Sequence, residues 1–187
     1  MRIRGAFQHL FRLAFLLALL LLAGCAAPAV TWVSRPPLSR IESAQVDVRF
    51  EPVKEGVTYF NVFRLTVVNR SAEPVTVDWN RTRYLYGGAN AGAFAFKGIA
   101  PEQIKAGTVP PDVIAPAAQL TKIIAPVRLI AFAPMGAKGV GIATEGIRAG
   151  TIPEGEHGIA LALSFSGGTV LEKLSVRIEA VPAAPAP

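Results

Sequence analysis

The chain has 187 residues, 51% of them hydrophobic, and carries 19 lysines and arginines against 13 acidic residues. This basic excess is spread along the chain without a block of about five or more like charges, so the electrostatic pattern of a nucleic-acid-binding protein is absent. Cys25 is the only cysteine, which excludes an internal disulfide.

The first 24 residues have the composition of an export signal. Arg2, Arg4 and Arg12 precede an apolar run over residues 13–24, and no acidic residue lies among them. This run is shorter than the roughly 20 apolar residues that a membrane-spanning helix needs. We therefore predict a signal peptide over residues 1–24. Without its three arginines, 16 basic residues face 13 acidic residues, a net charge of +3.

The residues Leu22-Ala23-Gly24-Cys25 end the apolar run and resemble the lipobox of bacterial lipoproteins. In that family the cysteine thiol becomes a diacylglyceryl thioether, the signal is cut just before it, and the new amine is acylated. The resemblance implies that Cys25 is lipidated. Several acyl chains make a durable membrane anchor, because each buried methylene contributes about 0.8 kcal/mol. A plain secretory signal, cleaved near the small residues 26–28, is the alternative.

The residue that follows the cysteine bears on the choice of membrane. In Gram-negative lipoproteins an Asp at this place favours retention in the inner membrane, whereas this chain has Ala26. The resemblance thus implies a lipid-anchored protein of the cell envelope, held in the outer membrane and facing the periplasm.

The segments at either end of the remaining chain lack helical or strand periodicity. Residues 25–42 contain three prolines and predict a semi-extended tether. Residues 182–187 form a low-complexity tail of proline and alanine. The residues between them, 43–181, are numerous enough for one domain with a hydrophobic core.

Period-two alternation of apolar residues, interrupted by turn residues, predicts seven to nine short strands in this domain. Val75, Val77 and Trp79 share one strand face, which places the Trp79 side chain in the core. Gly167-Gly168 indicates a tight hairpin between the last two strands. The predicted strands are residues 44–51, 58–69, 74–80, 83–86, 93–98, 120–126, 127–133, 158–166 and 170–180.

The phrases "FRLTVVNRSAEPVTVDWN" and "IPEGEHGIALALSFSGG" resemble immunoglobulin-like domains of small bacterial envelope lipoproteins. Such domains often have a strand ending in Asn-x-Ser, a short turn, a second apolar strand, and later a Pro-x-Gly-Glu turn. The resemblance and the number of strands together imply an all-β fold, an immunoglobulin-like antiparallel β-sandwich. The pair of core cysteines found in antibody domains is absent, so packing alone must hold it.

The stretch "VDWNRTRYLYGG" contains the candidate binding residues Arg83, Tyr84 and Tyr86. Aromatic rings and guanidinium groups in such proximity suit a glycan or a peptide. The alternative is structural, with Asp78 paired locally to Arg81 or Arg83 at a sheet edge. The proline-rich segment 98–119 is long for a sandwich connection, so it has either a functional role or the role of covering an edge strand.

The sequence lacks a recognisable catalytic or metal-binding constellation. His157, the one histidine beyond the signal, has Glu154 and Glu156 beside it but neither a nucleophile nor a set of metal ligands. We expect its imidazole to lie in an exposed turn without a chemical role. The glycine-containing segment 136–146 matches neither dinucleotide- nor phosphate-binding patterns. The sequence therefore predicts a protein that is not an enzyme and uses neither a metal nor a cofactor.

Our leading hypothesis is a lipid-anchored envelope protein whose sandwich binds or scaffolds another envelope protein. The alternative is a binder of small ligands or glycans that uses Arg83, Tyr84, Tyr86 and the loop after them. An exposed apolar patch or an open sheet edge would favour the first. A concave pocket with converging polar groups would favour the second.

Overall fold

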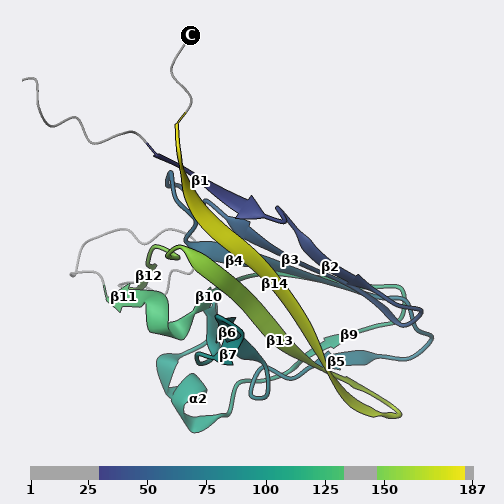
Figure 1. Ribbon diagram of the computed structural model, residues 1–187. Coiled ribbons are helices and arrows are strands. Elements are labelled where there is room, and N and C mark those ends of the chain that lie inside the picture. The colour runs from purple at the N-terminus through teal and green to yellow at the C-terminus, as the bar shows by residue number, and fades with distance from the viewer. Residues whose placement is uncertain (1–29, 133–146, 184–187) are drawn as a thin grey trace, which may run out of the picture. The chain divides into compact units, whose positions relative to one another are not determined.

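The computed structural model describes residues 30–132 and 147–183 and is nearly all β (Figure 1). The predicted signal peptide, Cys25 and the segment 136–146 lie outside the described residues. The described part also contains a short helix, α2 (Pro101–Ala106), and a 3-10 turn, η1 (Val127–Leu129). The strands are β1 (Val30–Arg35), β2 (Ser39–Glu42), β3 (Val46–Val53), β4 (Val62–Asn69), β5 (Val75–Val77), β6 (Arg83–Tyr86), β7 (Ala89–Asn90), β8 (Phe94–Phe96), β9 (Asp112–Ile114), β10 (Gln119–Pro126), β11 (Ile130–Phe132), β12 (Ile147–Ala149), β13 (Gly155–Phe165) and β14 (Gly168–Pro182).

Two antiparallel sheets pack face to face and confirm the predicted β-sandwich (Figure 1). The first, here called the β13 sheet, has the order β1-β14-β13-β5-β9, with β6 and β7 attached beside β13. The second, the β4 sheet, has the order β2-β3-β4-β10-β8. The series β3-β4-β10-β8 opposite β14-β13-β5 reproduces the ABED and GFC order of immunoglobulin domains. A small third sheet pairs β11 with β12.

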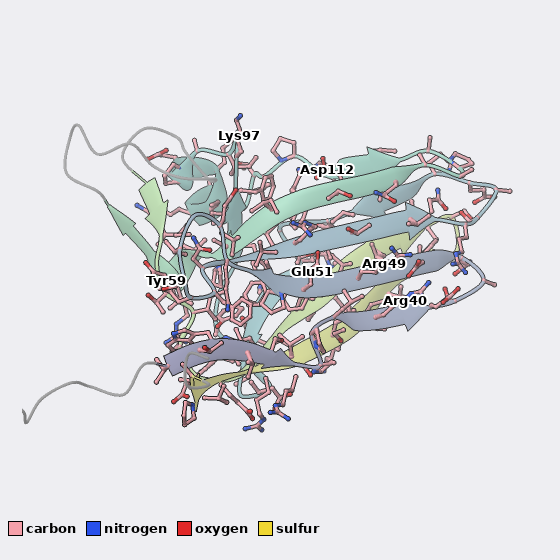
Figure 2. All side chains as sticks on the ribbon, turned by 90° about the horizontal axis from the view of Figure 1, so that it is seen from above. Arg40, Arg49, Glu51, Tyr59, Lys97 and Asp112 are labelled. Carbon is pink, nitrogen blue, oxygen red and sulfur yellow. The ribbon has the colours of Figure 1, made fainter. Side chains whose placement is uncertain are left out.

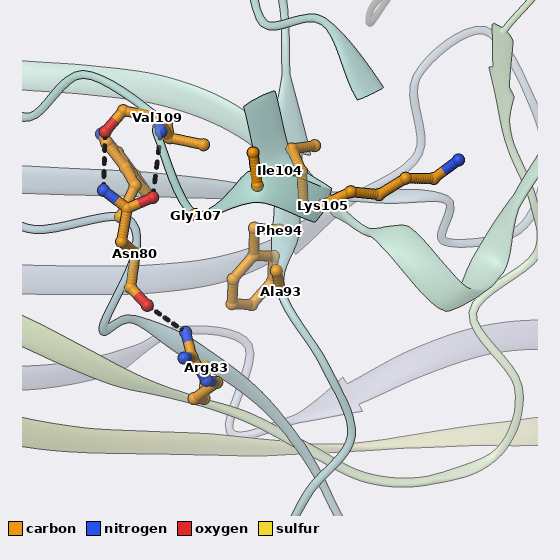
Figure 3. Close-up of a pocket in the computed structure, with 10 residues that line it drawn as sticks. Asn80, Arg83, Ala93, Phe94, Ile104, Lys105, Gly107 and Val109 are labelled. Carbon is orange, nitrogen blue, oxygen red and sulfur yellow. Dashed lines mark hydrogen bonds between the residues drawn. The ribbon is translucent and has the colours of Figure 1, made fainter. Parts of the chain in front are cut away.

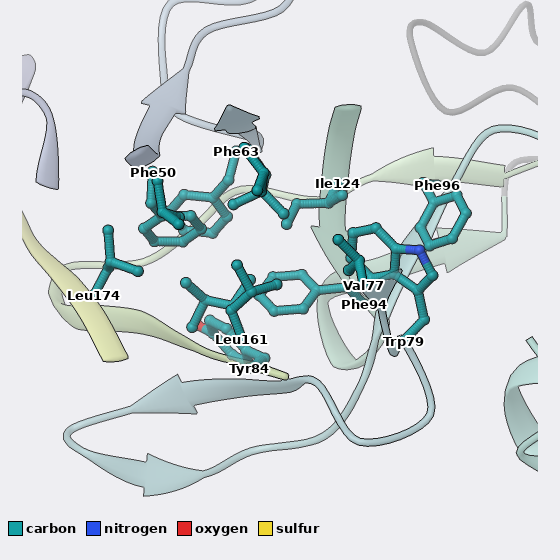
Figure 4. Packing of buried hydrophobic residues seen from close by; sticks show 14 of the residues in the cluster. Phe50, Phe63, Val77, Trp79, Tyr84, Phe94, Phe96, Ile124, Leu161 and Leu174 are labelled. Carbon is teal, nitrogen blue, oxygen red and sulfur yellow. The ribbon is translucent and has the colours of Figure 1, made fainter. Parts of the chain in front are cut away.

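The core lies between the two sheets because alternate side chains of each long strand point inward. Phe50 of β3 and Phe63 of β4 stack with their ring centroids 4.5 Å apart. Leu161 of β13 and Leu174 of β14 approach them from the opposite sheet (Figure 4). All four side chains are at most 2% exposed, so the period-two pattern of the sequence is the pattern of burial.

The predicted inward face of β5 is confirmed. Val75 and Val77 are fully buried, and Trp79, just beyond the end of the strand, is 4% exposed. The indole ring packs on Phe96 of the opposite sheet with centroids 4.6 Å apart. Trp79 therefore belongs to the core.

A polar junction joins the two sheets at Trp79. One carboxylate oxygen of Asp112, on β9, accepts a 2.6 Å hydrogen bond from the indole Nε1 of Trp79. The same oxygen forms an ion pair with Lys122 Nζ, also at 2.6 Å. Lys122 pairs with buried Leu65 in the register of β10 and β4, so its side chain starts on the inward face. The ammonium lies 4.0 Å from the ring centroid of Phe96. This arrangement lets a cation occupy the rim of the core.

A second polar cluster lies on the outer face of β2 and β3 (Figure 2). The carboxylate of Asp47 is 1% exposed and accepts two hydrogen bonds from Arg40, at 2.7 and 2.9 Å, and one from Arg49 at 2.8 Å. The Arg40 hydrogen bonds, opposed by desolvation and aided by Arg49, lower the pKa of Asp47 to about 2. Asp47 is therefore ionised at neutral pH and draws the arginines of two strands together.

Residues 30–42, which we predicted as part of an extended tether, instead form the edge strands β1 and β2. β1 joins the β13 sheet and β2 joins the β4 sheet, and residues 36–38 make the bend between them. Trp32 and Ile41 pack against the core. The two strands are short, and two prolines stand between them, so the few inward positions of each strand hid its alternation in the sequence.

The predicted long loop 98–119 also contains regular structure. α2 begins with Pro101, whose fixed φ suits the first turn, and ends at Gly107, which adopts a left-handed φ of 66°. β9 then pairs with β5 and completes the edge of the β13 sheet. The segment thus covers the edge of β5, and β9 becomes the outermost strand. Covering an edge strand was one of the two roles that we expected for this segment.

We predict that Trp79→Ala lowers the free energy of unfolding by about 3 to 5 kcal/mol, because it removes a buried indole and leaves a cavity. Trp79→Phe should cost clearly less, since it keeps most of the packing and removes the bond to Asp112. Urea melts monitored by circular dichroism measure both. Val113→Ala, at a position 67% exposed, is the control and should change stability by less than about 0.5 kcal/mol. A loss below 1 kcal/mol for Trp79→Ala would show that the ring is not part of the core.

Candidate binding site around Arg83

The three candidate binding residues lie on β6 but do not form one site. Tyr84 and Tyr86 pair with Ile159 and His157 of β13, so both rings lie on the inward side of the sheet. Arg83 directly precedes Tyr84 on the same strand, so its side chain lies on the other side of the strand. The strand therefore separates the guanidinium group from the two aromatic rings.

Tyr84 is a core residue, which corrects its assignment to a binding site. Its side chain is 1% exposed, and its hydroxyl lies 2.6 Å from Nδ1 of His157. Phe94 packs edge-on against the ring at 5.7 Å. A ligand cannot reach this side chain without opening the core, because β13 and the opposite sheet enclose it.

His157 is fully buried, which corrects the expectation of an exposed turn. Its other ring nitrogen, Nε2, lies 2.8 Å from the carbonyl oxygen of Pro153. A carbonyl only accepts, so Nε2 carries the proton and donates, and Nδ1 accepts the Tyr84 hydroxyl proton. The prediction was wrong because the neighbours of His157 are residues typical of turns. β13 begins at Gly155, before the apolar run, so His157 is part of the sheet.

Burial fixes the charge of this pair. Desolvation lowers the pKa of His157 below its ordinary value, although the Pro153 carbonyl acts in the opposite direction. Desolvation likewise raises the pKa of Tyr84. Both groups are therefore neutral at physiological pH, and the chain from Tyr84 through His157 to Pro153 is a structural hydrogen-bond network.

Tyr86 covers the outer end of this network. It is 39% exposed, and its ring centroid lies 5.2 Å from that of His157. Its hydroxyl donates a 3.2 Å hydrogen bond to the carbonyl of Glu154, and the guanidinium carbon of Arg128 lies 5.8 Å from its ring centroid. Part of the Tyr86 side chain is accessible to a partner, while one side of its ring packs on His157.

A cavity of about 280 Å³ lies beside Arg83, under α2 (Figure 3). Its walls come from the turn after β5, from the start of β8, and from α2 with the residues that follow it. Both polar and apolar atoms face it. The lining residues are Trp79, Asn80, Arg83, Ala93, Phe94, Ile104, Lys105, Ala106, Gly107 and Val109.

Hydrogen bonds fix the polar wall of this cavity (Figure 3). Arg83 Nη1 donates to the carbonyl oxygens of Asn80 at 2.7 Å and Thr82 at 2.9 Å. The Asn80 amide donates to the Val109 carbonyl at 2.8 Å and accepts from the Val109 N–H at 3.0 Å. Asp78, expected to pair with a neighbouring arginine, instead accepts backbone N–H groups of the turn, at 2.9 Å from Asn80 and 3.2 Å from Arg81.

Sequence reasoning found Arg83 but missed the residues that face it. Ile104, Lys105 and Val109 belong to the long segment 98–119, whose length and prolines were the only signal. Nothing local connects these positions to Arg83, more than twenty residues earlier in the chain. The long-range amide pairing of Asn80 with Val109 brings them together.

We predict that His157→Ala destabilises the protein by about 2 to 4 kcal/mol, because it opens a cavity and leaves Tyr84 without its partner. The lowered pKa also makes stability depend on pH. The contribution of His157 is complete above its unfolded pKa, near 6.5, and is lost as the pH falls from there towards the folded pKa. Below pH 6.5 the unfolding free energy should therefore fall by up to about 1.4 kcal/mol per pH unit.

Chemical denaturation between about pH 7.5 and pH 5 measures this slope. His157→Gln retains a polar side chain but cannot titrate, so its stability should be flat over the same interval. Equal slopes for the two proteins would contradict the assignment of the slope to His157.

Comparison with known proteins assigns no family. The chain matches no known family model, no curated protein and no solved structure. Over residues 30–132 and 147–183, no helix is long and apolar enough to cross a membrane. The same residues contain no group of three or more His, Cys, Asp or Glu side chains that could hold a metal ion.

Proposed function

We propose that the protein is a lipid-anchored lipoprotein of the cell envelope whose sandwich is a non-enzymatic module that binds or scaffolds another envelope protein. The observation that carries this proposal is the sequence Leu22-Ala23-Gly24-Cys25, which stands shortly before a β-sandwich. Four residues separate Cys25 from Val30, and an extended residue spans at most about 3.6 Å. An anchor at Cys25 would keep the sandwich close to the membrane. Ala26 favours the outer membrane and the periplasm.

The buried, hydrogen-bonded position of His157, the one histidine beyond the signal, supports a non-enzymatic role. Acid-base catalysis near neutral pH most often uses an imidazole, which must reach the reacting group. In His157 both ring nitrogens are within hydrogen-bond distance of fixed partners, the hydroxyl of the buried Tyr84 and the backbone carbonyl of Pro153. The group best suited to such chemistry is thus used for packing.

An exposed apolar patch supports a protein partner. Val113 of β9 is 67% exposed and Leu171 of β14 is 54% exposed. The strand registers place both on the outer face of the β13 sheet, with the partly exposed Thr76 and Ser164 between them. None of these four side chains carries a charge. We call them the outer patch, and such uncharged, partly apolar surfaces are typical of protein contacts.

The cavity beside Arg83 favours a second candidate function, the binding of a small ligand. Its volume of about 280 Å³ is near the lower end of ligand pockets. Apolar walls and a few fixed polar groups are also typical of such sites. The cavity lies under α2, whereas the outer patch is formed by β9, β5, β13 and β14, so one protein can serve both functions.

We predict that Cys25→Ser abolishes lipidation and releases the domain from the membrane, because no other cysteine can carry the acyl chains. Mass spectrometry of the wild-type protein should find acyl groups on Cys25, and fractionation should find the wild-type protein in the membrane pellet. An unmodified wild-type Cys25 would refute the proposed anchor.

We predict that Leu171→Glu removes the contact with the protein partner, because it replaces one of the two exposed apolar side chains of the outer patch by a charge. In-cell crosslinking of the full chain, followed by mass spectrometry, should lose at least one defined crosslinked species. Ser175→Glu, exposed four residues further along the same strand face, is the matched control and should retain it. Identical crosslinks in wild type and Leu171→Glu would exclude the outer patch as the contact.

A further inference from the structure

We propose that the cavity under α2 binds a small organic carboxylate with an aromatic or branched apolar body. Arg83 would face the carboxylate, while Trp79 and Phe94 would contact the apolar body. This inference rests on the second candidate function, the binding of a small ligand, and names the chemical class of that ligand.

Charge is the first argument for this class. Arg83 and Lys105 are the only ionisable side chains among the ten lining residues, so the lining carries two positive charges and no negative one. Within the described residues, neither of them forms an ion pair, in contrast to Arg40, Arg49 and Lys122. The ammonium of Lys105 extends away from Arg83 (Figure 3), so the guanidinium is the cation that a bound anion would meet, and no negative charge in the lining opposes it.

Arg83 is also held in a conformation suited to an anion. Its Nη1 is fixed by the carbonyls of Asn80 and Thr82, at 2.7 and 2.9 Å. A guanidinium has five N–H donors, so these two bonds leave others for a ligand. The planar group fits a carboxylate with two parallel hydrogen bonds, and a side chain that is already ordered loses little entropy on binding.

The apolar wall argues against an inorganic anion as the preferred ligand. Trp79 and Phe94 are each 4% exposed, and Val109 is 5% exposed, so the aromatic and aliphatic wall is part of the packed core. Ile104 of α2 adds to this wall and packs against the same core. The part of this wall that faces the cavity is apolar, so a ring or a branched chain fits there better than a ligand that only carries charge.

The walls are fixed before any ligand arrives. Trp79 is oriented by Asp112, and Val109 is tied to Asn80 by two hydrogen bonds. Volume then limits the ligand, because about 280 Å³ accommodates a small molecule or the end of a chain. Benzoate, a ring joined to one carboxylate, is the simplest probe with these properties.

The test is a titration of the full chain in detergent with benzoate, benzamide and inorganic phosphate, followed by calorimetry and tryptophan fluorescence. Benzoate should bind saturably, and benzamide, its neutral counterpart of similar shape, should bind at least about tenfold more weakly because the charge-assisted bonds are lost. Phosphate should also bind more weakly than benzoate. Equal affinity for benzoate and benzamide, tighter binding of phosphate, or no saturable benzoate binding would overturn the proposal.

Two substitutions locate the site. Arg83→Gln should weaken benzoate binding by about tenfold or more. Arg83 also holds the turn after β5, so Lys105→Glu, at an exposed position of α2, provides a variant that preserves the fold and should likewise weaken binding. Arg81→Gln, exposed and outside the lining, is the control and should bind as wild type. Unchanged affinity in both pocket variants would place the ligand elsewhere and overturn the proposal.

The outcomes separate this inference from the proposed anchor and outer patch, and binding of benzamide as tight as that of benzoate would keep the small-ligand function while excluding a carboxylate site. Leu171→Glu and Cys25→Ser alter the outer patch and the anchor, and both should bind benzoate as wild type does. If benzoate fails while acylation and crosslinking persist, the carboxylate site is wrong and the envelope module stands. If benzoate binds while crosslinking is unaffected by Leu171→Glu, the carboxylate site stands and the outer patch is wrong.

Discussion

The ion pair between Asp112 and Lys122 is the interaction that connects the packing of the two sheets to the candidate site. It joins β9 of one sheet to β10 of the other, and the same carboxylate oxygen accepts the indole proton of Trp79. Because Trp79 is both a core residue and a wall of the cavity under α2, this one carboxylate links sheet packing to the shape of the candidate site. A half-buried ion pair contributes little by its charges alone, and its value here lies in fixing orientation.

The sequence predicted the sandwich because its long strands bury one face completely. Alternation over β3, β4, β13 and β14 is strong enough to read without a structure, and Val75, Val77 and Trp79 were placed on the correct face. The short edge elements β1, β2, β9 and α2 were missed or read as a tether and loop. Each has at most six residues and lies in a proline-containing stretch, so two or three inward positions cannot establish a period.

The site was predicted only in part, for a related reason. Arg83, Tyr84 and Tyr86 looked like one polar-aromatic group, but strand alternation separates Arg83 from the tyrosines, and Tyr84 finds its partner 73 residues away in His157. His157 looked exposed because its neighbours are turn formers. Pairings of this kind depend on strand register between distant segments, which local composition does not determine.

Without a disulfide, the protein uses polar side chains to hold its weakest strand. β9 has three residues and lies at the edge of its sheet, yet side chains of the β4 sheet bind it at both ends. Lys122 binds Asp112, and the fully buried amide of Asn69 donates a 2.9 Å hydrogen bond to the Ile114 carbonyl. Val113, between these two anchors, points outward. An edge strand fixed in this way holds its outward apolar side chain in a defined position, where a partner can contact it.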